Sequence, residues 1–308
     1  MGTPKAAVPS LESLIEAGHE VVAVYTQPDR PAGRGNIITQ PPVKESAILH
    51  GIHVYQPEKL RTDEAIMEFK SHDADVAIVV AYGRILSADY LNAFRLGAIN
   101  VHFSLLPKYR GAAPVNWAIV NGETETGVTT MKMDIGLDTG DILLQHTTSI
   151  GDEETAIELM DRLSVVGADL LIKTLSEFDN LSPIRQDDDL ATLAPIMKKS
   201  DGEVDWSMSA KQIIDRFRGF QPFPSSFSFF RGQRVRFGKA SLSETSTVGE
   251  VGSIIDLGKD HISVACGGGS AVDLIELQPE GKKMISAANF INGSKPIVGE
   301  MFHKQQQG

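Results

Sequence analysis

Two polar residues lie two positions apart in an apolar run that is typical of a β-strand. The run AINVHF covers residues 98–103, and its polar members are Asn100 and His102. Side chains of a strand alternate between its faces, so these two point to the same face. Asn supplies an amide donor and acceptor, and His can gain or lose a proton near neutral pH. The pair therefore suits a reaction in which a carbonyl oxygen gains negative charge while a proton moves.

A carboxylate for the same site is available from the loop DIGLDTG, residues 134–140. An Asp beside a His raises the basicity of the imidazole and fixes its tautomer, which makes Asp138 a natural third member. Structural interpretations compete with this one. Asn-x-His on a strand is commonly local hydrogen bonding, and Asp in a Gly-bearing turn is a common turn former. The residue types alone leave both interpretations open.

Other kinds of catalytic site fit the sequence less well. Ser104 follows His102 closely, but no G-x-S-x-G nucleophile elbow surrounds it. The sequence has no Cys cluster and no His pair at ligand spacing, so we expect no metal site. The single cysteine, Cys266, has no cationic neighbour in the sequence and is interpreted as a small buried apolar residue.

The first part of the chain alternates between helical and strand-like stretches. The predicted helices are SLESLIEAG, PPVKESAILHG, TDEAIMEFK and SADYLNAFRLG, and the strands that follow them are VVAVYT, IHVYQP, DVAIVVAYG and AINVHF. Ser10 is predicted to cap the first helix, and Gly18 to lie just past its end. This alternation predicts an α/β fold with a doubly wound, mostly parallel sheet that binds ligands at the carboxyl ends of its strands.

A strand is also expected before the first helix, because a right-handed crossover needs one. The sequence opens at MGTPKAAVPS, which resembles the loop after such a strand. We therefore expect that the first strand is missing, through truncation or a misassigned start, unless the sheet is completed in another way.

The remaining segments predict two domains of different class. GVTTMKM and DILLQHTTSI, joined by DIGLDTG, predict an antiparallel hairpin at the sheet edge, and a long amphipathic helix follows. Apolar residues no longer recur at regular spacing over residues 182–200, which we predict to be a linker. Beyond it, the helical stretch SAKQIIDRFRGF and several short β-rich runs predict a smaller OB-like β-barrel. The predicted domains are residues 1–181 and 201–308.

Composition limits the class of protein. The chain has 308 residues, of which 42% are hydrophobic and 22% charged, as in a globular protein with room for two cores. No apolar run is long enough to span a membrane, and the first residues lack the pattern of a signal peptide. A single cysteine indicates a reducing compartment. We expect a soluble, cytoplasmic monomer.

Charge is distributed unevenly along the chain. The formal net charge of -11 argues against a polyanionic partner, yet residues 216–239 contain several Arg and Lys and no acidic residue. Such a segment is either a solvated face or an anion-binding surface. Charge alone does not decide between the two.

Longer motifs add a resemblance to a known family. NVHFSLLPKYRGAAPVNWAI, followed by GVTTMKMDIGLDTGDIL, resembles the signature of the 10-formyltetrahydrofolate-dependent formyltransferases. The segments QPDRPAGRG, residues 27–35, and APIMKKSDGEVDWSMSA, residues 194–210, resemble the branch of that family that acts on initiator tRNA. The resemblance implies transfer of a formyl group from 10-formyltetrahydrofolate to the amino group of methionine esterified to initiator tRNA. It also implies a Rossmann-like catalytic domain, residues 1–181, and a tRNA-binding domain, residues 201–308.

The resemblance assigns roles to individual residues. Asn100 and protonated His102 would hold the oxyanion, and Asp138 would keep His102 charged and oriented. The implied folate-binding residues are Arg84, Ile85, Leu86, Ser104, Leu105, Leu106 and Pro107. The implied tRNA-binding residues are Arg30 and Arg34 in an inserted basic loop, and Arg216 and Arg218 in the second domain.

Rival functions make different demands on the sequence. A formyltransferase that acts on a purine precursor or a nucleotide sugar would keep Asn100, His102 and Asp138 but lack the RPAGRG loop and the small β domain. A folate hydrolase would transfer the formyl group to water. A non-catalytic RNA-binding module would need the basic stretch but not the three polar residues.

Overall fold

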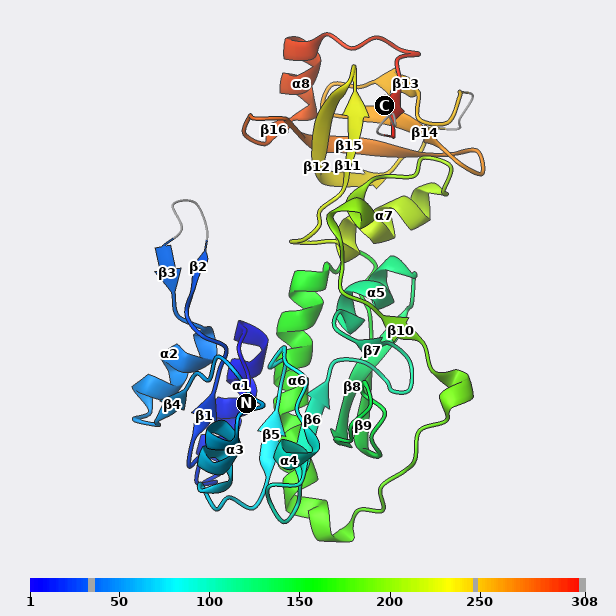
Figure 1. Cartoon of the computed structure of the whole chain (residues 1–308). Coiled ribbons are helices and arrows are strands. Elements are labelled where there is room, and N and C mark those ends of the chain that lie inside the picture. The colour runs from blue at the N-terminus through cyan, green and yellow to red at the C-terminus, as the bar shows by residue number, and fades with distance from the viewer. Residues whose placement is uncertain (33–36, 246–248, 305–308) are drawn as a thin grey trace. The chain divides into compact units, whose positions relative to one another are not determined.

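The computed structural model describes residues 1–32, 37–245 and 249–304. The chain divides into two compact units, which we describe separately (Figure 1). Unit 1 consists of Met1–Pro114, Glu125–Ser149 and Glu158–Pro195. Unit 2 consists of Val115–Thr124, Ile150–Ile157 and Ile196–Gly308.

Helices and strands alternate in the first part of unit 1, as predicted. The order is η1 (Lys5–Ala7), α1 (Val8–Glu16), β1 (Val24–Tyr25), α2 (Pro42–Leu49), β4 (Val54–Tyr55), α3 (Asp63–Lys70), β5 (Ala77–Val79), α4 (Ala88–Leu91) and β6 (Ala98–His102). Local chemistry sets several boundaries. Thr62 caps α3, because its hydroxyl accepts a hydrogen bond from the Ala65 N–H at 3.3 Å. A hairpin that was not predicted, β2 (Arg30–Ala32) and β3 (Ile37–Thr39), follows β1.

The first helix begins earlier than predicted. Its N-cap residue is Ala7, not Ser10. Pro9 lies in the first turn of the helix. Proline has no N–H, and it is tolerated there because first-turn N–H groups have no acceptor within the helix. Ser10 therefore lies inside α1, where its buried hydroxyl has no hydrogen-bond partner among the described residues. Gly18 follows the helix with a φ of 82°, as a helix-terminating glycine should.

The strands of unit 1 form two hydrogen-bonded groups. β1 and β4 are a parallel pair, and the other group has the order β5-β6-β8-β9. β5 and β6 are parallel, whereas β8 (Glu125–Lys132) pairs with β6 and with β9 (Ile142–Ser149) in antiparallel fashion. The predicted hairpin is therefore confirmed. Between the two groups lie Met1 and Gly2: the Gly2 N–H donates to the Tyr25 carbonyl, and the Val80 N–H to the Met1 carbonyl, both at 2.9 Å.

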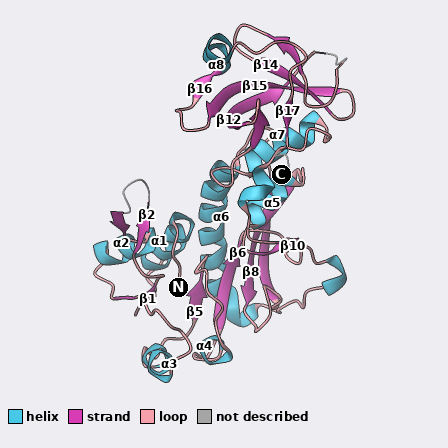
Figure 2. Ribbon diagram, turned by 45° about the horizontal axis from the view of Figure 1, so that its top comes forward, coloured by secondary structure: helices cyan, strands magenta, loops and turns pink. Residues whose placement is uncertain are grey.

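Helices cover both faces of this sheet. α6 (Ala156–Glu177) lies alongside β6 and β8 (Figure 2), and a Cβ on Gly167 would come within 2.9 Å of Val101 Cγ1. On the other face, Phe69 of α3 and Tyr90 of α4 pack with Tyr25 in an aromatic core. Because strand residues alternate, the close approach of α6 to Val101 assigns Asn100 and His102 to the face opposite α6.

The end of unit 1 is tied to its sheet. After η2 (Phe178–Asn180) and η3 (Asp188–Leu190), the strand β10 (Leu193–Ala194) pairs in parallel with β7 (Arg110–Gly111). The Ile142 N–H also donates to the Ile184 carbonyl at 2.8 Å. Residues 182–195 of the predicted linker are thus bonded to unit 1 rather than loose.

Unit 2 is built on a curled antiparallel sheet, which confirms the predicted change of class. Its strands are β11 (Phe227–Phe230), β12 (Gln233–Leu242), β13 (Ile254–Leu257), β14 (Ile262–Cys266), β15 (Ser270–Pro279), β16 (Ile285–Ser286) and β17 (Phe302–His303). The order is β13-β14-β15-β12-β11-β17, with β16 beside β15. An isolated bridge, Ser253–Met301, links the two ends of the sheet, as in a partly closed barrel.

Helices fill one side of this sheet. η4 (Lys199–Gly202) precedes α7 (Ala210–Gly219), whose Ile213 and Phe217 enter the core, and α8 (Ala287–Ser294) adds Phe290. α5 (Pro114–Val120) packs on α7, because the Asn116 side chain donates to the Gly219 carbonyl at 2.7 Å. Cys266 is buried in this core, and burial raises the pKa of its thiol to about 12, so the apolar interpretation of Cys266 agrees with its position.

Two further classes of feature were searched for among the described residues. None of their helices combines the length and the apolar character needed to cross a membrane. Within the same residues, no group of three or more His, Cys, Asp or Glu side chains is placed to hold a metal ion.

The close packing of α6 predicts the effect of a branched side chain. Gly167→Val should lower the free energy of unfolding by about 1–3 kcal/mol, measured by urea denaturation, because the new atoms overlap Val101 and Val128. Gly293→Val in α8 is the matched control, because a Cβ at Gly293 has no atom within 4 Å. Equal losses in the two variants would contradict this packing.

Candidate active site

β6 carries the first two candidate residues into a buried site. Asn100 is 8% exposed and His102 5% exposed. Their register partners on the antiparallel strand β8 are Met131 and Thr129. Both side chains are therefore held by a strand that is paired on both edges at Asn100, with β5 on one side and β8 on the other.

The two ring nitrogens of His102 have different environments. Nε2 lies 3.0 Å from the carbonyl oxygen of Tyr109, and since a carbonyl only accepts, Nε2 carries a proton and donates it. Nδ1 faces Oδ2 of Asp138 at 3.7 Å. Nδ1, the ring nitrogen that is not bound to Tyr109, is therefore the one that faces the carboxylate.

The backbone of the neighbouring segment orients the Asp138 carboxylate. Its Oδ2 accepts a hydrogen bond from the Gly111 N–H at 2.8 Å, and the residue itself adopts a φ of 53°. Asp134, in the same loop, accepts from the Gly136 N–H at 3.0 Å and from the Thr139 hydroxyl at 2.7 Å. The structure thus brings Asp138 beside His102, although the gap of 3.7 Å is longer than a hydrogen bond.

Gln186 holds the loop from behind, and sequence reasoning missed it. Its Nε2 donates to the carbonyl oxygens of Asp138 at 2.8 Å and Gly140 at 2.7 Å. Its Oε1 accepts from Nε of Arg110 at 3.0 Å, and Arg110 also pairs with Asp188 at 2.9 Å. The only available sequence signal was the loss of apolar periodicity around Gln186, which does not indicate a buried amide.

The turn after β6 is stabilised by its own polar groups. The Ser104 hydroxyl donates to the Lys108 carbonyl at 2.7 Å. Thr129 donates to the Ser104 carbonyl at 2.7 Å and accepts from the Leu106 N–H at 3.1 Å. Ser104 and Leu106 are buried, while Leu105 and Pro107 are partly exposed. Ser104 is therefore a structural residue of this turn, and a folate contact there would come from Leu105, Pro107 or the backbone.

The second predicted folate segment is divided between surface and core. Ile85 is 77% exposed, and the Arg84 guanidinium donates to the Glu58 carbonyl at 2.7 Å. Leu86 is buried in the core beside Tyr82 and Tyr90. Of these three side chains, Ile85 has the exposure that a ligand contact requires.

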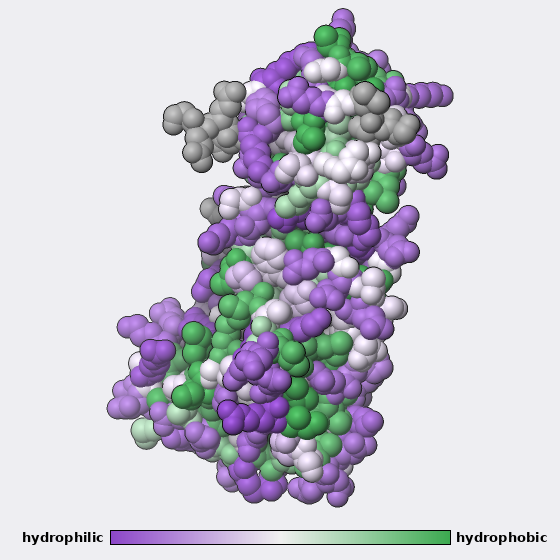
Figure 3. Space-filling model, turned by 90° about the vertical axis from the view of Figure 1, so that its right-hand side faces the viewer, coloured by the Kyte–Doolittle hydropathy of each residue, from purple (hydrophilic) through white to green (hydrophobic). Residues whose placement is uncertain are grey.

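Apolar side chains are also exposed on the loop that carries Asp138. Ile135 is 81% exposed and Leu137 60% exposed. Figure 3 shows hydrophobic residues gathered over parts of the surface of unit 1. A pocket for a flat heteroaromatic ring needs apolar walls of this kind beside a few polar groups.

The predicted tRNA-binding residues differ in their solvent exposure and in the contacts that they already make within the protein. Arg30 is exposed on β2, and Arg34 lies outside the described residues. Arg216 is partly buried, with its guanidinium 5.2 Å from the centre of the Phe220 ring. Arg218 is buried, where it donates to the Gly151 and Glu154 carbonyls at 2.9 Å and pairs with Asp215 at 2.7 Å. These contacts give Arg218 a structural role in unit 2.

The rest of the basic stretch lies on β11 and β12. Arg231 is paired with Glu300 at 2.7 Å, and Arg234 lies 3.8 Å from the centre of the Phe227 ring. Arg236 and Lys239 are exposed on β12, whereas Val235 and Phe237 point into the core. Alternation along β12 thus places Arg236 and Lys239 on its outer face, where the register partner of Lys239 is the exposed Glu276.

Comparison with known proteins identifies the family. The family described as "Formyl transferase" matches residues 1–175, and "Formyl transferase, C-terminal domain" matches residues 196–295. The chain is 49% identical over 302 residues to the methionyl-tRNA formyltransferase of Solibacter usitatus, covering 97% of this chain and 96% of the relative. It is also 49% identical over 307 residues to that of Citrifermentans bemidjiense, covering 99% and 96%.

A solved structure shares the fold. The N-formyltransferase of Helicobacter canadensis, in complex with folinic acid and dTDP-3-aminofucose, matches with a TM-score of 0.66 and 20% identity over 89% of this chain and 97% of that chain. The resemblance found in the sequence motifs is therefore confirmed by full-length relatives and by the fold. The chain belongs to the formyl transferase family.

Proposed function

We propose that this protein transfers the formyl group of 10-formyltetrahydrofolate to the amino group of methionine carried by initiator tRNA. The observation that carries the proposal is the arrangement of Asn100 and His102 on one face of β6, with the Asp138 carboxylate 3.7 Å from the imidazole. Relatives that are 49% identical over nearly their whole length are methionyl-tRNA formyltransferases. We expect the protein to act in the cytoplasm.

The geometry divides the chemical work among the three residues. When the substrate amine attacks the formyl carbon, the carbonyl oxygen becomes an oxyanion, which the Asn100 amide N–H and the His102 imidazolium stabilise. Because Nε2 is bound to the Tyr109 carbonyl, the proton that charges His102 resides on Nδ1. The Asp138 carboxylate faces that nitrogen at 3.7 Å.

The reaction also requires the transfer of a proton. The attacking amine loses a proton, and the nitrogen of the departing tetrahydrofolate gains one. Asp138 is only 15% exposed, and a carboxylate in such a place can relay the proton through a water molecule. This role requires no metal ion, and 10-formyltetrahydrofolate enters as a co-substrate.

A nucleotide-sugar substrate is the second candidate. The Helicobacter canadensis protein, whose structure contains dTDP-3-aminofucose, is only 20% identical to this chain. The similarity between the two proteins is therefore one of fold. The deciding assay is transfer of labelled formyl to charged initiator tRNA, with uncharged tRNA, elongator methionyl-tRNA and an amino-sugar nucleotide as controls. Labelling of the amino sugar without labelling of the tRNA would overturn the proposal.

Loss of the oxyanion donor should slow turnover. Asn100→Ala should reduce kcat on the order of 100-fold or more in the labelled-formyl assay, while tRNA affinity stays close to that of the parent protein. Asn92→Ala, at an exposed position after α4, is the control and should keep parental turnover. Near-normal kcat in Asn100→Ala would remove Asn100 from the mechanism.

Gln186 should act as a positioning residue. Gln186→Glu removes both bonds to the Asp138 loop while keeping the shape of the side chain, so kcat should fall about 10- to 100-fold with little change in KM. The pH profile of kcat should shift as well, because Asp138 no longer faces His102 at a fixed distance.

The neighbouring exposed residue supplies the control for Gln186. Arg185→Gln changes a side chain that points to solvent and should leave kcat and its pH profile unchanged. A Gln186→Glu variant with parental kcat and an unshifted profile would mean that the loop holds its position without this amide.

Exposed basic residues should contribute to tRNA binding through phosphates. Arg30→Gln should weaken binding and reduce the slope of log K against log salt by about one, as expected for one lost phosphate contact. Arg61→Gln, at another exposed position of unit 1, is the control. An unchanged salt slope in Arg30→Gln would exclude Arg30 from the contact.

A further inference from the structure

A cluster of polar residues lies at the root of the hairpin β2–β3, the residues 27–29 that lead into Arg30. Its members are Gln27, Asp29, Lys44 and Gln56. They come from the segment after β1, from the first turn of α2 and from the residue after β4. The cluster therefore joins separate parts of unit 1 just before the chain enters β2.

Lys44 is fully engaged within this cluster. Its ammonium group has three N–H donors, and three oxygen atoms accept from it. Oδ1 of Asp29 lies 2.9 Å from Nζ, Oδ2 of Asp29 lies 2.7 Å away, and Oε1 of Gln56 also lies 2.7 Å away. The Lys44 side chain is only 16% exposed. Lys44 therefore has its donors occupied inside the protein, although its charge alone would suggest a phosphate contact.

Gln56 orients the same carboxylate from a second direction. Its Nε2 donates to Oδ1 of Asp29 and to the carbonyl oxygen of Gln27, both at 2.8 Å. Hydrogen bonds from Lys44 and from Gln56 lower the pKa of the Asp29 carboxyl, because they stabilise its charged form. The root of the hairpin is thus held at two points, the Gln27 carbonyl and the Asp29 side chain.

The side chain of Gln27 ties the root to the segment after β5. Its Nε2 donates to the carbonyl oxygens of Tyr82 at 3.1 Å and Gly83 at 3.2 Å. Gly83 has a φ of 76°, and a Cβ there would lie 2.6 Å from Nε2 of Gln27, so this close approach requires glycine. Gly83 directly precedes Arg84, the first residue of the predicted folate segment.

Packing contributes little to the direction of the hairpin. Figure 1 shows β2 and β3 extending away from α2. The side chains of Arg30, Pro31, Ile38 and Thr39 are exposed. An isolated two-stranded hairpin is only marginally stable in water. The direction of this hairpin relative to the rest of unit 1 therefore depends on the hydrogen bonds at its root.

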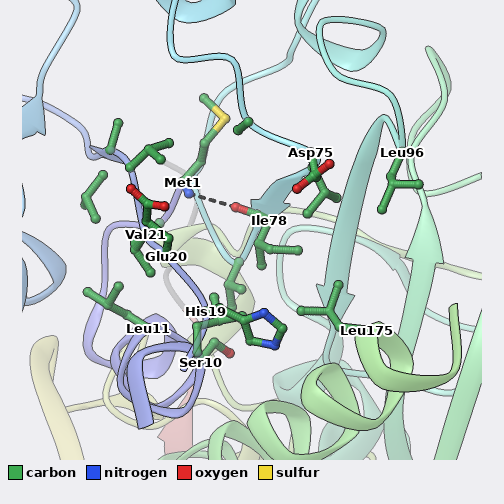
Figure 4. Close-up of a pocket in the computed structure, with 18 of the residues that line it drawn as sticks. Met1, Ser10, Leu11, His19, Glu20, Val21, Asp75, Ile78, Leu96 and Leu175 are labelled. Carbon is green, nitrogen blue, oxygen red and sulfur yellow. Dashed lines mark hydrogen bonds between the residues drawn. The ribbon is translucent and has the colours of Figure 1, made fainter. Parts of the chain in front are cut away.

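The helix that carries Lys44 is itself anchored. The Ser46 hydroxyl of α2 donates to Glu12 of α1, and Nε2 of His50 lies 2.8 Å from Oε2 of the same carboxylate. Val43 points inward and lines a cavity of about 500 Å³, drawn in Figure 4, which none of the four residues of the cluster lines. Lys44 thus extends to the hairpin from a helix that is fixed against α1.

We propose that Lys44 is a positioning residue for tRNA, because its grip on Asp29 fixes the direction in which the hairpin β2–β3 presents Arg30 to a phosphate. Lys44 itself does not touch the RNA. The identity of the ligand rests on the proposed function, whereas the hold of Lys44 on the hairpin does not.

Paired spin labels measure the direction of the hairpin without tRNA. Ile38→Cys and Met67→Cys place labels at exposed positions of β3 and α3, while Cys266 is buried and the pKa of its thiol is raised to about 12, so it stays unlabelled. Lys44→Met should widen the distribution of distances between the labels about twofold, measured by double electron–electron resonance, because the root gains conformational freedom. The exposed Lys59, after β4, supplies the control, and Lys59→Met should keep the parental width. A parental width in Lys44→Met would overturn the proposal.

A second variant removes the other half of the pair. Asp29→Asn keeps the shape of the side chain but loses its charge, so it should widen the same distribution. If the two residues act as one unit, the double variant of Asp29→Asn with Lys44→Met should be no wider than the wider single variant. Widths that add up in the double variant would mean that Lys44 does not act through Asp29, and would overturn the proposal.

Initiator tRNA supplies the functional measurement. Lys44→Met should raise the Kd for methionyl-initiator-tRNA about tenfold, because a hairpin that is no longer held must be ordered on binding. The KM for 10-formyltetrahydrofolate and kcat at saturating tRNA should stay at their parental values. The slope of log K against log salt should also stay unchanged, because no phosphate contact is lost. Lys59→Met loses the same charge and should change Kd far less.

Two results separate this proposal from its alternatives. A salt slope lower by about one in Lys44→Met, with a parental distance distribution, would indicate a direct phosphate contact and would overturn the positioning role. Failure of the parent protein to bind initiator tRNA would refute the proposed function instead, and the label distances would still decide whether Lys44 holds the hairpin.

Discussion

One buried side chain, Gln186, fixes the distance between the two ionisable groups of the site. Its amide binds two carbonyls of the loop 134–140, while Arg110 holds its oxygen. A loop with glycines at both of its turns would otherwise have many conformations, and ordering it costs entropy. Because Gln186 is 5% exposed, these bonds form away from competing water and keep the Asp138 carboxylate facing His102.

The site joins a rigid element to a tethered one. β6 carries Asn100 and His102 in a strand covered by helices on both faces, whereas Asp138 comes from a loop that also exposes Ile135 and Leu137. Covering exposed apolar side chains with a ligand removes them from water, which lowers the free energy. Folate binding over this loop would therefore bury apolar surface and strengthen the electrostatic interaction between Asp138 and His102.

The sheet of unit 1 and the basic residues of unit 2 show how context changes the meaning of a pattern. Arg218 and Arg236 both belong to the basic stretch, yet Arg218 is buried against Asp215 and two carbonyls, and Arg236 is exposed. Ser10 has the residue type of a helix cap, but Pro9 moves the start of α1 and places Ser10 against a cavity. Neither outcome follows from residue type.

The sequence by itself determined the periodicity of unit 1, the hairpin β8-β9, the change to a curled antiparallel sheet in unit 2, and the positions of Asn100 and His102 on one strand face. These features depend on local alternation and turn chemistry, which neighbouring residues encode. Only the tertiary structure decided that Asp138 meets His102 and that Gln186 holds the loop. Those contacts join residues far apart in the chain, and their distances are set by how the sheet and its helices pack.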